Sequence, residues 1–104
     1  MSPEDAKLTI KKTTLAAVQA AVHSITSKDL YKFYAPFAFT IANVIWTVLQ
    51  ALGQSGPSGV FKLIKMNEAV VAITAKIKSV LPVVYQTLQA KLESFLVQVL
   101  KKLT

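Results

Sequence analysis

The stretch GQSGPSG, residues 53–59, contains all three glycines of the 104-residue chain and one of its four prolines. Glycine, proline and serine in such a cluster mark a loop, and no other stretch of the chain gives so strong a loop signal. The loop divides the chain into two halves of similar length. Each half is helical by composition and has one proline near its middle, Pro36 in the first and Pro82 in the second.

We therefore predict a single all-α domain of four amphipathic helices, arranged as an antiparallel helical bundle or hairpin. Two arrangements satisfy this pattern. One has four packed helices, and the other has two long proline-kinked helical arms joined by the loop. The expected helices cover about residues 3–25, 28–53, 59–81 and 82–103, with the loop at 53–59.

The first expected helix has small residues spaced four apart. Ala16 precedes Ala20 and Ala17 precedes Ala21 at this spacing. Such pairs let another helix approach closely, either in a bundle or in a membrane. High helix propensity explains the alanines equally well.

The second expected helix begins with an aromatic cluster, YKFYAPFAF, at residues 31–39. At about 100° per residue, its polar residues fall in one narrow stripe that also contains Pro36, and nearly all of its other residues are apolar. The polar residues are Asp29, Lys32, Thr40, Asn43, Thr47, Gln50 and Gln54. We expect this helix to carry more apolar surface than three neighbouring helices can cover.

The excess surface predicts contact with lipid or with another protein, although the aromatic rings also suit the end of a helical bundle. The candidate contact residues are Tyr31, Lys32, Phe33, Tyr34, Phe37, Phe39, Trp46 and Leu49. No charge occurs from residue 33 to residue 61, and residues 36–53 approach the length that crosses a bilayer. Because Asn43 and Gln50 lie near the centre of this segment, a bundle or a lipid surface is favoured over a span.

The third expected helix has a regular apolar seam with alternating spacings of three and four. Its members are Leu63, Met66, Val70, Ile73, Ile77 and Val80. This a/d pattern predicts a partner helix along a defined line. Pro82 then follows with no turn residue before it, which indicates a kink or a short corner rather than a tight reversal. The helix after Pro82 is amphipathic, with an apolar face that covers about a third of its circumference.

The chain is basic, and lysine alone supplies its positively charged side chains. Its formal net charge is +7, and all twelve basic residues are lysines. Lysine lacks the planar fork with which arginine grips phosphates and guanine edges, so sequence-specific nucleic-acid binding is unlikely. The lysines are dispersed along the chain, which suits solvated helix faces or an anionic membrane surface.

Residues that carry catalysis or metal binding are few. The chain has five acidic residues, one histidine and no cysteine. Three acidic residues fall in expected first turns of helices, where the helix dipole explains them, and His23 falls on a polar face. The stretch at 53–59 lacks the lysine of a phosphate-binding loop. We therefore predict no catalytic, cofactor-binding or metal site, and no enzyme.

Two classes of function remain. The first is a lipid- or membrane-associated helical protein, and the second is a self-assembling structural subunit, either homo-oligomeric or part of a larger assembly. A plain four-helix bundle is the third alternative. The opening MSPEDAKLTIKK does not resemble a cleavable signal, so a cytoplasmic or membrane-associated location is expected.

Overall fold

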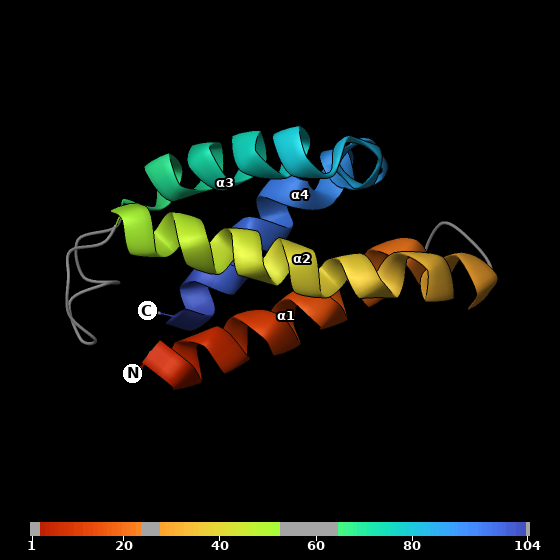
Figure 1. Cartoon of the computed structure of the whole chain (residues 1–104), viewed down its shortest axis with the longest axis horizontal. Helices are drawn as coiled ribbons and strands as arrows, with labels where there is room; N and C mark the ends of the chain where they lie inside the picture. The colour runs from red at the N-terminus through yellow and green to blue at the C-terminus, as the bar shows by residue number, and fades with distance from the viewer. Residues whose placement is uncertain (1–2, 24–27, 53–64, 104) are drawn as a thin grey trace.

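The computed structural model describes the backbone of residues 3–23, 28–52 and 65–103, and the side chains of residues 4–20, 36–52 and 65–103. These residues form four α-helices: α1 (Pro3–His23), α2 (Lys28–Leu52), α3 (Met66–Val80) and α4 (Pro82–Leu103) (Figure 1). The described residues contain no strand, so the predicted all-α class is confirmed.

The helices pack in a closed cycle. α1 packs against α2, α2 against α3, α3 against α4, and α4 back against α1. α1 and α2 run antiparallel, and α4 crosses behind α2 from the α3 corner down to α1 (Figure 1). The result is an elongated bundle with principal extents of 42 × 23 × 19 Å and both chain ends at the same end of the molecule.

All four helices contribute to one apolar core. The burial of their apolar faces is the main stabilising term, at about 25 cal/mol per Å² removed from water. The largest side chains with almost no exposure are Ile10, Ile41, Ile45, Leu49, Ile73, Ile77, Leu92 and Leu96. Each helix is therefore held by the others rather than by its own propensity alone.

The polar stripe predicted on α2 lies on its exposed side. Pro36, Asn43, Thr47 and Gln50 are exposed, and Thr40 is half-buried. A proline at an exposed position leaves the carbonyl that it frees accessible to water, so the helix continues through it.

The apolar side of α2 departs from the sequence expectation. Over residues 36–52 most of the apolar side chains are buried or half-buried against the other helices, and only Phe39 (51% exposed) and Leu52 (37%) stand out among the large ones. The prediction that α2 carries far more apolar surface than its neighbours cover is therefore wrong for these residues. The side chains of the aromatic residues at 31–34 lie outside the described ones.

α3 begins later than predicted. Lys65 has extended backbone angles (φ −82°, ψ 122°), and the helix starts at Met66 rather than near residue 59. This start places Glu68 in the first turn, where its carboxylate faces the positive end of the helix dipole. Residues 53–64, which contain the predicted loop and Leu63, lie outside the described ones.

The buried line of α3 also differs from the predicted seam. Ile73 and Ile77 are fully buried and Met66 and Val70 half-buried, as a seam requires, but Val80 is 44% exposed. The buried line consists of Ala69, Ile73 and Ile77, at spacings of four. A spacing of four suits a short straight helix that crosses its neighbours, whereas alternating threes and fours suit a supercoil. Val80 is the last helical residue, and the half-buried Leu81 packs against the core after it.

A single residue joins α3 to α4. The N–H of Leu81 donates to the carbonyl oxygen of Ile77 (2.7 Å), and its own carbonyl oxygen accepts from the N–H of Tyr85 (2.9 Å). Pro82 occupies the first position of α4, where its fixed φ suits a helix and its missing N–H costs nothing. The predicted short corner at Pro82 agrees with this geometry. It sets the direction in which α4 crosses to α1.

Candidate functional site

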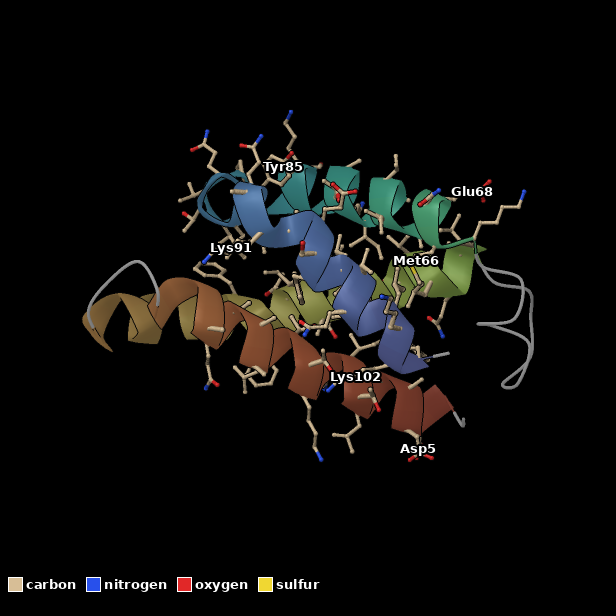
Figure 2. All side chains as sticks on the ribbon, turned by 180° about the vertical axis from the view of Figure 1, so that it is seen from behind. Asp5, Met66, Glu68, Tyr85, Lys91 and Lys102 are labelled. Carbon is tan, nitrogen blue, oxygen red and sulfur yellow. The ribbon has the colours of Figure 1, made fainter. Side chains whose placement is uncertain are left out.

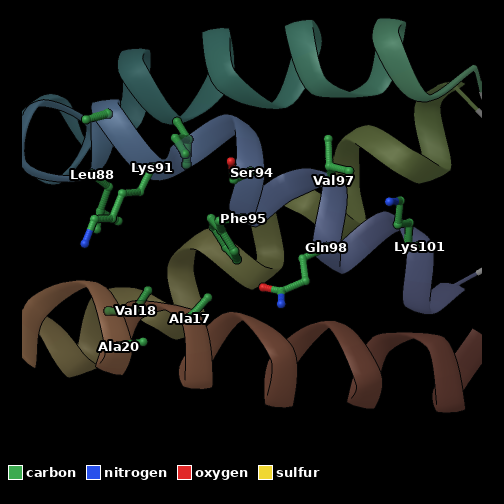
Figure 3. A pocket seen from close by; sticks show the side chains of 12 residues that line it. Ala17, Val18, Ala20, Leu88, Lys91, Ser94, Phe95, Val97, Gln98 and Lys101 are labelled. Atoms are coloured by element: carbon green, nitrogen blue, oxygen red, sulfur yellow. The ribbon is translucent and has the colours of Figure 1, made fainter. Parts of the chain in front are cut away.

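A groove runs along the surface where α1 meets α4. Its larger part has a volume of about 480 Å³, and Figure 3 shows α4 on one side of it and α1 on the other. A smaller hollow of about 320 Å³ lies between the same two helices. Ala17, Ala20 and Gln98 line both parts, so the two form one continuous surface feature, here called the α1–α4 groove.

The groove exists because α1 presents small side chains along it. Ala16, Ala17 and Ala20 line its α1 side, where larger side chains would fill the space. From the other side Phe95 points toward Ala17 (Figure 3), with Leu88 also in the lining. The alanines predicted to allow close helix packing thus border an open space instead of closing it.

Among the described residues, four lysines and no carboxylate line the groove. They are Lys12 on α1 and Lys91, Lys101 and Lys102 on α4. Since α4 runs antiparallel to α1 here, Lys12 lies at the same end as Lys102, and the apolar Leu88 lies at the opposite end with Lys91 (Figures 2 and 3). The groove therefore has one end with most of the positive charge and a more apolar remainder.

The polar groups of the described lining are suited to holding an anion. Ammonium groups only donate hydrogen bonds, and Gln98, Thr13 and Ser94 add neutral donors. Among the residues whose side chains the structure describes, the lining contains no histidine, cysteine or acidic residue. Over the described part of the chain, no group of three or more histidine, cysteine or acidic side chains lies close enough to hold a metal ion.

The structure does not gather the contact residues predicted on α2 into one surface. Leu49 is fully buried in the core, Phe37 and Trp46 are half-buried against it, and Phe39 is exposed. None of these four lines the α1–α4 groove. The side chains of the other predicted contact residues, at 31–34, lie outside the described residues.

The groove is not predicted from the sequence, although each of the two helices that form it has a relevant sequence pattern. The alanine spacing of α1 and the amphipathic pattern of α4 are visible in the sequence. Which two helices meet, and at what angle, depends on the α3–α4 corner and cannot be read from either pattern alone. Several lysines that looked merely dispersed along the chain are brought together by this crossing.

Large apolar side chains are also exposed elsewhere. They are spread over all four helices, and two of them, Val80 and Val83, flank the α3–α4 corner. The exposed set is Leu8 (50%), Phe39 (51%), Leu52 (37%), Val71 (70%), Val80 (44%) and Val83 (62%). Within the described residues, none of the helices combines the length and the hydrophobicity needed to cross a bilayer.

The fold and groove together define an all-α helical bundle with a lysine-bordered apolar surface groove. Comparisons of the chain with protein-family models, with curated proteins and with solved structures find no match. Function therefore has to be argued from the groove and its charges.

Proposed function

We propose that this chain is a non-enzymatic lipid-associated helical protein that binds anionic lipid through the α1–α4 groove. The observation that carries the proposal is the composition of the groove, whose described lining combines apolar side chains with four lysines and no acid. An alkyl chain in the lining leaves water, and an anionic headgroup meets the ammonium groups.

Three physical effects support the proposal. Each methylene that is fully buried contributes about 0.8 kcal/mol, so even partial burial of an alkyl chain in an open groove provides useful affinity. Lysine side chains lay their apolar stems along such a surface and keep their charge in water, so they extend the groove without closing it. The net charge of +7 adds long-range attraction toward an anionic membrane, and salt screens this attraction.

Self-assembly as a structural subunit is the second candidate function. It is favoured by the exposed large apolar side chains outside the groove, which include Val71 at 70% and Val83 at 62% exposure. Exposed apolar surface of this kind can be covered by another copy of the chain or by a larger assembly. Because the exposed residues are scattered over four helices, the lysine-bordered groove is the better-defined site.

Flotation with lipid vesicles, paired with mass determination in detergent-free buffer, tests the proposal. We expect the protein to float with vesicles that contain an anionic lipid, and to float less with neutral vesicles or at high salt. A discrete or open-ended oligomer that ignores both kinds of vesicle would favour the structural subunit instead. A monomer that binds no vesicle would leave a plain four-helix bundle and contradict both candidates.

A further inference from the structure

We infer that the α1–α4 groove holds one single-chain anionic amphiphile lengthwise, with its headgroup between Lys12 and Lys102 and its alkyl chain running toward Phe95 and Leu88. This inference rests on the proposed lipid association and narrows it to one kind of ligand. A fatty acid has the required chemistry, which is one alkyl chain with an anionic head.

The size of the groove favours a single chain. The larger part holds about 480 Å³, which is in the lower half of the roughly 300–1,000 Å³ typical of small-ligand sites. It lies between two helices that pack against each other, so its width is limited on both sides. A lipid with two chains would have to leave one of them in water.

The direction of the ligand follows from the charges. Lys12 and Lys102 are both exposed and come from different helices, so they can approach a headgroup from two sides. Gln98 and Thr13 line the same end and add neutral hydrogen-bond donors. At the other end Leu88 and Phe95, 5% and 8% exposed, lie beside a single lysine, Lys91, so this end has less positive charge and suits a methyl terminus better.

Calorimetric titration with dodecanoate, below its micelle-forming concentration, tests this placement. We expect one dodecanoate per chain, and little binding of dodecyltrimethylammonium, which has an alkyl chain only one carbon longer and the opposite charge. Equal binding of the two detergents would overturn the role of the lysines.

A groove-filling variant tests the location. Ala20 is exposed and lines both parts of the groove, so Ala20→Phe places a ring in the path of the alkyl chain. We expect dodecanoate binding to fall more than about tenfold. Ala75→Phe is the matched control, because Ala75 is exposed on α3 and outside the groove lining. Equal binding by the two variants would overturn the assignment to this groove.

A charge-removal pair tests the headgroup position. The double variant Lys12→Ala/Lys102→Ala should weaken dodecanoate binding about fivefold, because each exposed lysine contributes only modestly. The control Lys7→Ala/Lys76→Ala removes the same charge from exposed positions outside the lining. Equal losses in the two double variants would show that only net charge matters, and would overturn this orientation.

The vesicle experiment separates failure of this inference from failure of the proposed function. If the protein floats with anionic vesicles but does not bind dodecanoate, the single-chain inference is wrong and lipid association stands. If it binds neither vesicles nor dodecanoate, both are wrong.

Discussion

The side-chain nitrogen of Lys78 lies 5.7 Å from the centroid of the Tyr85 ring, across the corner that joins α3 to α4. A cation within about 6 Å of an aromatic ring is attracted to its face. The contact therefore links the last turn of α3 to the first turn of α4. It supports the corner at Leu81 and Pro82, and hence the direction in which α4 crosses to α1.

A double-mutant cycle measures the interaction energy between Lys78 and Tyr85. We expect Lys78→Ala and Tyr85→Leu to show an interaction of about 0.5 kcal/mol, typical of an exposed cation–π pair. Urea unfolding, followed by the fluorescence of the single Trp46, measures the free energies. The parallel cycle with Lys76→Ala, an exposed lysine on the same helix, should show no coupling. No measurable interaction energy in the Lys78 cycle would mean that this contact does not stabilise the corner.

Thr14 is fully buried on α1, and its hydroxyl has no hydrogen-bond partner among the described residues. A buried polar group without a partner lowers stability because it has lost its bonds to water. We therefore expect Thr14→Val, which keeps the shape and removes the hydroxyl, to raise the free energy of unfolding by about 1 kcal/mol.

The matched control for Thr14 is Thr47→Val on α2. The Thr47 hydroxyl is exposed and donates to the carbonyl oxygen of Asn43 at 2.8 Å. This change should alter stability by less than about 0.5 kcal/mol. Denaturant titration of both variants checks the pair. Destabilisation by Thr14→Val would mean that its hydroxyl is satisfied in solution.

The buried line of α3 predicts a sharp contrast between neighbouring positions. Ile73 is fully buried and Val71 is 70% exposed. We expect Ile73→Ala to cost about 2–5 kcal/mol by leaving a cavity, and Val71→Ala to change stability by less than about 0.5 kcal/mol. Thermal or urea unfolding measures both. Similar losses at the two positions would contradict the packing of α3 described above.

A change at Phe39 distinguishes lipid binding at the contact residues predicted on α2 from lipid binding in the α1–α4 groove. Its side chain is 51% exposed and does not line the groove. We expect Phe39→Ser to leave dodecanoate binding within about twofold of the unchanged protein, because an exposed side chain outside the groove does not contact a ligand bound there. The same calorimetric titration gives the affinity. A loss as large as that expected for Ala20→Phe would move the lipid site to α2.

The elements that the sequence predicts well are those set by local pattern. The polar stripe of α2 places Asn43 and Gln50 on the exposed side, as the 100° helical period requires. Pro82 marks the boundary between α3 and α4, because a proline without an N–H suits the first position of a helix. The amphipathic period of α4 likewise predicts a helix with one buried face.

The elements that the sequence predicts poorly depend on tertiary packing. The a/d seam predicted a partner helix along one defined line of α3, but this short helix contacts both α2 and α4, buries Ala69 with Ile77 and exposes Val80. The apolar surface of α2 looked excessive because the sequence does not show how much of it the other helices cover. The α1–α4 groove needs the crossing angle of two helices, which no single-helix pattern contains.

Intermolecular nuclear Overhauser effects between dodecanoate and isotope-labelled protein test the central claim most directly. We predict contacts from the terminal methyl of the ligand to Leu88 and Phe95, and from the methylenes next to its carboxylate to Lys12 and Lys102. Contacts to the exposed residues Phe39, Val71 or Val83 in place of these, or no contacts at saturating dodecanoate, would contradict a lipid site between α1 and α4.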